Sequence, residues 1–204
     1  EQNPDRSAFV MAATGERVSY QEFEARSNRV AHYLADKGLG FQDHYSIFME
    51  NNNRYLESCA AGERSGLYFT CINSFLTSDE LAYIINNSES QILITSMSKL
   101  EAAQEALAQC TAIKEVLVVG AGDADLPEGM SDFASTLSKY PETPLERELL
   151  GAAMLYSSGT TGRPKGIVRP LPEQSPNEPL PVIGFLSGLW RYREDMIYLS
   201  PAPL

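Results

Sequence analysis

Residues 91–119 read QILITSMSKLEAAQEALAQCTAIKEVLVV and give the clearest indication of the fold class. Its two ends, at 91–95 and 115–119, are short runs rich in Val, Ile and Leu, which is typical of strands buried on both faces. Between them, Ser98 followed by Glu101 predicts a capping box that opens an amphipathic helix running to about Cys110. A strand, a helix and a strand in this order predict a right-handed parallel crossover.

The same alternation extends toward the N-terminus. Ser19 with Glu22 and Thr77 with Glu80 predict two more capped helices, and Gly38 predicts the end of the first. A further helix is expected at 54–65 and strands at 44–50 and 67–72. We therefore expect an α/β fold with a mostly parallel sheet flanked by helices.

Residues 120–148 interrupt this rhythm. They combine Gly and Pro with seven acidic side chains, at Asp123, Asp125, Glu128, Asp132, Glu142, Glu146 and Glu148. This composition predicts a solvated surface connection containing a short helix near 132–137, and a regulatory or partner-binding loop is the alternative. Residues 1–150 are accordingly interpreted as an α/β scaffold with an acidic connection.

The remainder, residues 151–204, begins with the expected strand 152–157 and a Gly-rich stretch, SSGTTGRPKG, at 157–166. β character resumes at 167–169, and five prolines then crowd residues 170–181 and predict an irregular segment. Residues 182–190 are apolar and predict a buried helix that places Trp190 in the core, and 196–199 predict a last short strand.

Charge is distributed unevenly along the 204 residues. The formal net charge is −11, but residues 1–150 carry a net −12 and residues 151–204 a net +1. No Asp or Glu falls between Leu149 and Pro172, whereas Arg163, Lys165 and Arg169 do. The acidic total argues against nucleic acid and anionic lipid as partners, and the acid-free, cationic window favours a small anionic ligand.

The remaining composition narrows the class of protein. Three cysteines, at Cys59, Cys71 and Cys110, form no close pair in sequence, which favours reduced core thiols and a cytoplasmic location, with peripheral membrane association left open. His32 and His44 lie at no spacing typical of a metal site. No apolar run is long enough for a membrane span, and no signal segment is visible.

The stretch 157–166 carries the chemistry. Gly159 and Gly162 permit close backbone approach, so that successive N–H groups can converge on an anion. Lys165 adds a mobile full charge, and hydroxyl groups add donors at several angles, from Ser157, Ser158, Thr160 and Thr161. A Walker A loop opens a helix with its lysine directly after a glycine, whereas here Pro164 and Gly166 flank the lysine and β-like residues follow. A loop between strands is therefore expected to hold a polyphosphate.

The sequence YSSGTTGRPKG at 156–166 resembles the phosphate loop of the adenylate-forming superfamily, which includes acyl-CoA synthetases, aryl-CoA ligases and peptide-synthetase adenylation domains. The stretches ERSGLYFTCIN at 63–73 and ELAYI at 80–84 resemble bacterial fatty-acyl-CoA synthetases most. The resemblance covers nearly the whole chain. Cys71 stands where many relatives carry proline, and the residues after Gly166 depart from the His-containing strand of many relatives.

The resemblance implies an ATP-dependent fatty acid–CoA ligase whose substrates are a carboxylic acid, ATP and CoA, with Mg²⁺. It implies that Lys165 acts as the catalytic charge clamp on phosphate, and that Thr160 or Thr161 contacts Mg²⁺. The ATP β/γ-phosphates are expected to bind the loop residues Ser157, Ser158, Gly159, Thr160, Thr161, Gly162 and Lys165. Arg163 and Arg169 are expected to be solvated or structural.

The family's adenine, ribose and acyl-pocket segments and its C-terminal lid with the main catalytic lysine are not found in these residues. The chain begins at Glu1 instead of Met, and we expect the first part of a large N-terminal adenylation domain, inactive alone. Two alternatives remain: an amino-acid or aryl-acid adenylating enzyme, and a non-enzymatic nucleotide-binding α/β module.

Overall fold

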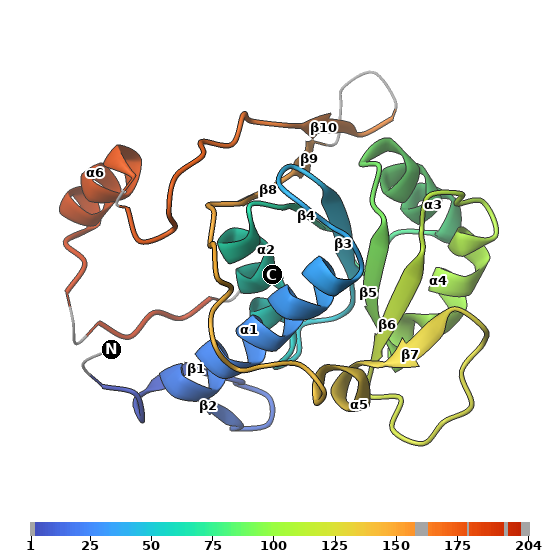
Figure 1. Ribbon diagram of the computed structural model, residues 1–204, viewed down its shortest axis with the longest axis horizontal. Coiled ribbons are helices and arrows are strands. Elements are labelled where there is room, and N and C mark those ends of the chain that lie inside the picture. The colour runs from blue at the N-terminus through green and yellow to red at the C-terminus, as the bar shows by residue number, and fades with distance from the viewer. Residues whose placement is uncertain (1–2, 158–162, 179, 194–195, 201–204) are drawn as a thin grey trace.

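The computed structural model describes residues 3–157, 163–178, 180–193 and 196–200 (Figure 1). Its centre is a six-stranded parallel sheet in the order β7-β6-β5-β3-β4-β8. The helices are α1 (Tyr20–Asp36), α2 (Tyr55–Ser65), α3 (Ser78–Asn87), α4 (Leu100–Leu107), α5 (Phe133–Leu137) and α6 (Pro181–Trp190). The sheet strands are β3 (His44–Phe48), β4 (Tyr68–Cys71), β5 (Ile92–Ser96), β6 (Glu115–Val119), β7 (Met130–Asp132) and β8 (Ala152–Ala153).

Two hydrophobic clusters sandwich this sheet. On one face, α1, α2 and α5 cover side chains such as Tyr45 and Ile47 of β3. On the other face, α3 and α4 cover Phe48, Leu93 and Val118. The strand residues are buried on both sides because alternate side chains enter opposite clusters, which confirms the predicted helix-flanked parallel sheet.

Local sequence signals set several boundaries. The capping boxes of α1 and α3 form as predicted, with Ser19 and Thr77 accepting the backbone N–H of Glu22 and Glu80. Gly66 ends α2 in the left-handed conformation. The predicted capping box at Ser98 is wrong, because Ser98 Oγ donates to the Glu50 carboxylate at 2.5 Å, and a 3₁₀ turn, Met97–Lys99, precedes α4 instead.

The connection at 120–148 is more structured than predicted. It contains an edge strand, β7, which pairs in parallel with β6, and α5 follows where the short helix was expected. Asp132 caps α5 by accepting the Ser135 N–H at 2.7 Å. Partial burial would raise the pKa of its carboxyl, but hydrogen bonds to the carboxylate outweigh burial and lower this pKa. The strand was missed because only one of its three residues, Met130, is apolar.

Near the C-terminus, the structure departs from the prediction at α6 and at the expected last strand. Helix α6 is present, but it is not buried: Val182, Ile183, Phe185, Leu189 and Trp190 are each more than half exposed. The expected strand at 196–199 does not form, and Ile197, Tyr198 and Leu199 are exposed. Trp190 therefore lies outside the core that the described residues build. Among the described residues, no helix combines the length and apolarity that crossing a membrane requires.

Candidate functional site: an anchored hairpin around the Gly-rich loop

The predicted single strand 152–157 is divided between two sheets. Its first part, β8, pairs with β4 at the edge of the main sheet. Its last part, β9 (Leu155–Ser157), pairs antiparallel with β10 (Lys165–Ile167) in a separate two-stranded ribbon beside α3 (Figure 1). β structure thus resumes at Lys165, two residues earlier than predicted, and the Gly-rich loop joins the two strands of a hairpin.

The ribbon brings Ser157 and Lys165 together. They are register partners at the loop end of the ribbon. Both side chains are exposed, and no ion pair joins Lys165 to a carboxylate in the described part of the chain. The other predicted phosphate-binding residues lie outside the described residues: Ser158, Gly159, Thr160, Thr161 and Gly162.

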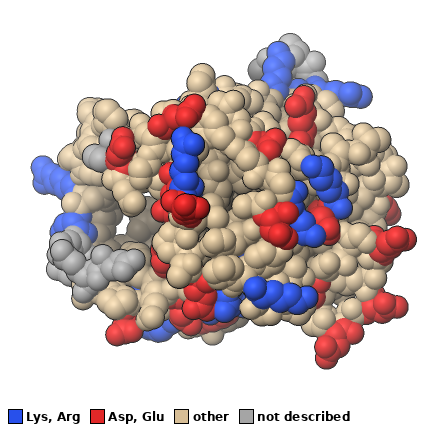
Figure 2. Space-filling model, viewed as in Figure 1, with Lys and Arg blue, Asp and Glu red and all other residues tan. Residues whose placement is uncertain are grey.

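The charge around the hairpin matches the acid-free window in the sequence. Figure 2 shows basic side chains at the upper edge of the molecule, while basic and acidic side chains are mixed over the rest of this face. Arg163 and Arg169 are exposed, as expected for solvated or structural roles. The guanidinium of Arg163 lies over the Tyr83 ring, 5.2 Å from its centroid, so this cation is held on α3.

Helix α3 contacts both strands of the hairpin. Tyr83 Oη donates to the Pro164 carbonyl at 2.9 Å, directly before β10. Tyr156 Oη, on β9, donates to Asn87 Oδ1 at 2.7 Å. Burial, together with the nearby Tyr83, raises the pKa of Tyr156 to about 12, so its phenol stays a hydrogen-bond donor at neutral pH.

The base of the ribbon is packed closely. Gly166 lies opposite Tyr156, and a Cβ at this glycine would fall 2.3 Å from Met154 Cε and 3.0 Å from the Tyr156 ring. Met154 is buried with Tyr68 and Leu171, and Tyr68 Oη donates to the Arg169 carbonyl at 2.5 Å. The segments on both sides of the loop are therefore fixed.

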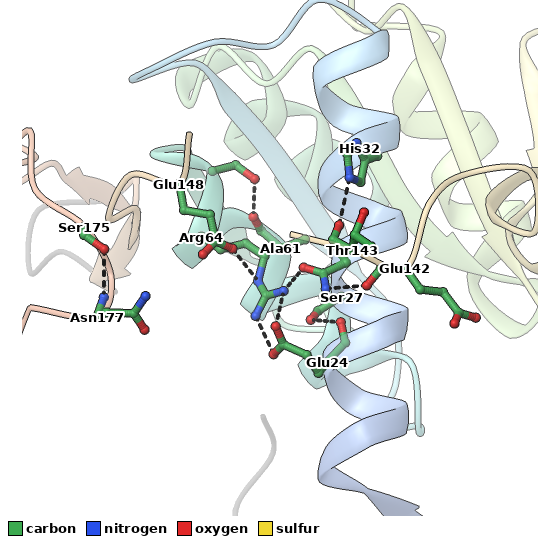
Figure 3. A network of polar contacts seen from close by, with 12 residues as sticks. Glu24, Ser27, His32, Ala61, Arg64, Glu142, Thr143, Glu148, Ser175 and Asn177 are labelled. Atoms are coloured by element: carbon green, nitrogen blue, oxygen red, sulfur yellow. Dashed lines mark hydrogen bonds and ion pairs between the residues drawn. The ribbon is translucent and has the colours of Figure 1, made fainter. Parts of the chain in front are cut away.

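The segment that leads into β8 is also fixed, although it belongs to the predicted solvated connection. Arg64 of α2 binds both carboxylate oxygens of Glu24, at 3.0 and 2.7 Å, contacts Asn28 Oδ1, and lies 3.7 Å from Glu148 (Figure 3). His32 Nε2 donates to the Thr143 carbonyl at 2.9 Å. The end of the acidic connection is thus tied to α1 and α2.

The cysteines and the second histidine pack in or beside the core clusters. Cys59 and Cys71 are free thiols with their sulfurs 3.7 Å apart at the edge of a core cluster, and Cys110 is a third, partly buried thiol. His44 stacks on Tyr68. Within the part of the chain that the structure describes, no three His, Cys, Asp or Glu side chains form a group that could hold a metal ion.

Ser157 and Lys165 were named from the sequence as candidate site residues, but Tyr83 and Asn87 were not. These two residues lie one turn apart on α3 and more than 65 positions before the residues that they bind. Tyr83 is partly buried and Asn87 is exposed, and a Tyr and an Asn at this helical spacing give no sign of their partners, so only the folded chain reveals them.

Comparison with known proteins agrees with this architecture. The family model for "AMP-binding enzyme" matches residues 1–204, and the chain belongs to the AMP-binding enzyme family. A 3-oxocholest-4-en-26-oate–CoA ligase of Rhodococcus rhodochrous is 31% identical over 169 residues, which cover 81% of this chain and 30% of the relative. Acyl-CoA synthetase 7 of Caenorhabditis elegans is 27% identical over 170 residues, covering 82% and 32%. The chain thus spans about a third of the length of these relatives.

Solved structures show the same fold. The anthranilate CoA ligase AuaEII in complex with anthranoyl-AMP aligns with a TM-score of 0.71 and 21% identity over 81% of this chain and 32% of that one. A protein described as a long-chain-fatty-acid CoA ligase from Rhodopseudomonas palustris aligns with a TM-score of 0.75 and 22% identity, over 94% and 46%.

Proposed function

We propose that the protein containing this chain is an ATP-dependent acid–thiol ligase. In the first step, a carboxylate oxygen of the acid bonds to the α-phosphorus of ATP while the bond to pyrophosphate breaks, giving an acyl-adenylate. In the second step, the CoA sulfur bonds to the acyl carbon and AMP leaves. The family assignment and the CoA-ligase relatives support this reaction.

The single observation that carries the proposal is the pairing of Ser157 with Lys165 beside the Gly-rich loop. Their exposed hydroxyl and ammonium groups lie in a stretch without carboxylates. The first step builds negative charge on the departing pyrophosphate, and donors held at that charge lower the barrier. We assign Lys165 to this charge and Ser157 to a phosphate hydrogen bond.

The rest of the phosphate site is part of the same proposal. Ser158, Thr160 and Thr161 contribute hydroxyl donors, and Gly159 and Gly162 contribute backbone donors. Mg²⁺ in such sites keeps several waters and is bound by substrate phosphates and one or two carboxylates. We assign the hydroxyl of Thr160 or Thr161 as one protein ligand of this ion.

We further propose that residues 1–204 form the first part of the adenylation domain and do not complete the reaction alone, since they span only about a third of the relatives. The named relatives favour a fatty or steroid acid as the substrate, with an aryl acid as the alternative. The three free thiols support the predicted cytoplasmic location.

The test is CoA thioester formation by the full-length protein with a panel of fatty, steroid, aryl and amino acids. The proposal predicts release of AMP and pyrophosphate and an acyl-CoA product for fatty or steroid acids. Thioester formation without ATP cleavage, or no turnover of any acid, would contradict it. The 204-residue chain tested in parallel should form no acyl-CoA.

A further inference from the structure

Two side chains on one face of α3 contact the two strands of the hairpin. Tyr83 and Asn87 are four residues apart, so they lie one above the other on the helix. Tyr83 reaches the backbone just before β10, and Asn87 reaches Tyr156 on β9. One rigid helix therefore contacts the segments on both sides of the loop, through two residues that were not predicted as site residues.

Tyr83 makes a double contact. Its hydroxyl donates to the Pro164 carbonyl, while its ring carries the Arg163 guanidinium. Because Arg163 and Pro164 directly precede Lys165, these contacts fix the backbone from which Lys165 projects. Lys165 itself makes no ion pair with a described residue, so its ammonium stays available to a ligand.

Asn87 acts on the other strand. Asn87 accepts a hydrogen bond from the hydroxyl of Tyr156, the residue before Ser157. The Tyr156 ring covers Gly166 on the opposite strand. A shift of this ring would move both Ser157 and the start of β10. Met154, Tyr68 and Leu171 hold the base of the ribbon, farther from the loop. The contacts of α3 hold the ribbon near the loop.

We propose that Tyr83 and Asn87 are positioning residues that hold the phosphate-binding hairpin in the geometry needed for adenylation. This proposal rests on the proposed function of the loop. The two residues do not touch the substrate; they act through Pro164 and Tyr156. Fixing donors before the substrate arrives removes the reorganisation that the transition state would otherwise require.

The experiment uses the full-length protein and two half-reactions. Tyr83→Phe removes the hydroxyl and keeps the ring under Arg163, and Asn87→Ala removes the acceptor for Tyr156. Tyr140→Phe is the matched control for the first, since the Tyr140 hydroxyl, in the turn after α5, donates at 2.7 Å to Asp36 at the end of α1. Asn86→Ala is the control for the second. Asn86 is also on α3, and its side-chain amide donates to the Gln109 carbonyl at 2.9 Å.

ATP–pyrophosphate exchange should fall about 5- to 20-fold in Tyr83→Phe and Asn87→Ala but not in the controls. Transfer of a supplied acyl-adenylate to CoA involves no β- or γ-phosphate, so it should keep the wild-type rate. A purely structural role would lower both half-reactions together, and that result, or unchanged exchange, would overturn the proposal. In a double-mutant cycle, Tyr156→Phe should add little further loss to Asn87→Ala.

A second measurement does not depend on activity. Trypsin cleavage after Lys165 requires the ribbon to open, because β10 begins at this residue. Cleavage there should be several-fold faster in the two variants than in their controls. If the wild-type protein exchanges no pyrophosphate with any acid, the proposed function fails. If the two variants and their controls are cleaved at equal rates, the anchoring role of Tyr83 and Asn87 fails.

Discussion

Lys165 lies directly opposite Ser157 on the two antiparallel strands that flank the Gly-rich loop. The pairing places a cation and a hydroxyl at the loop end of a ribbon whose base is buried and whose two strands are held by α3. The ribbon continues from β8, at the edge of the parallel sheet. Helices α1 and α2 hold the segment that enters β8, and α3 holds the ribbon itself. The placement of the ribbon therefore depends on residues of these three helices as well as on its own sequence.

Gly151 should tolerate no side chain. A Cβ at this position would lie 2.1 Å from the Gly62 carbonyl oxygen and 2.5 Å from that of Leu67. Gly151→Ala should therefore displace the start of β8 and lower the free energy of unfolding by about 1–3 kcal/mol or more.

Urea denaturation measures this effect. Gly184→Ala is the control, since a Cβ there meets no atom within 4 Å and the position lies in helix α6. The control should be neutral or slightly stabilising, because alanine favours helix over glycine. Equal stability of the two variants would contradict the close packing at Gly151.

Arg64 should be a main support of the segment that enters β8. Its removal leaves Glu24 and Asn28 without their shared partner and Glu148 without its neighbouring cation. Since the Arg64 side chain is only 15% exposed, Arg64→Ala should lower the free energy of unfolding by about 2–4 kcal/mol.

Arg147→Ala provides the matched control for thermal or urea unfolding. Arg147 pairs with Glu173 at 3.4 Å, with both side chains about 70% exposed, and such pairs contribute about 1 kcal/mol or less. Similar losses from the two arginine variants would mean that the Arg64 network is no stronger than a surface pair.

Glu57 should make stability depend on pH. Burial raises the pKa of its carboxyl to about 7, outweighing Arg54 at 3.3 Å. The folded state therefore binds a proton more tightly than the unfolded state, in which the pKa is near 4.5. The resulting stability is present in full below pH 4.5 and is lost as the pH rises through 7.

Glu57→Gln should remove this dependence. Between pH 5 and 8, the wild-type free energy of unfolding should fall by about 1–3 kcal/mol relative to this variant. Denaturant titrations at several pH values measure the difference. Glu146→Gln removes an exposed carboxylate as the control and should follow the wild type. Parallel curves for wild type and Glu57→Gln would refute the assignment.

Local signals in the sequence predicted much of the fold. Ser19 and Thr77 form capping boxes with neighbours three residues away, so no distant residue decides the outcome. Ser98 fails because a distant carboxylate, Glu50, binds its hydroxyl. The edge strand at Met130 forms through backbone pairing with β6, which leaves little trace in side-chain pattern.

The same distinction holds at the candidate site. Ser157 and Lys165 belong to one contiguous motif and could be named from sequence. Tyr83 and Asn87 could not, because their contacts with the hairpin arise from tertiary packing. The apolar residues of α6 predicted burial, yet no described segment covers Trp190. Hydrophobicity indicates that a face is suited to burial but does not identify what covers it.

The most direct test of the central claim is ATP–pyrophosphate exchange by full-length Lys165→Ala. Losing a charge that acts on the departing pyrophosphate should slow exchange at least about a hundredfold, while the acid is bound as well as before. Lys139→Ala, which removes an exposed lysine of the acidic connection, should exchange at the wild-type rate. Wild-type exchange in Lys165→Ala would contradict the proposed role of Lys165.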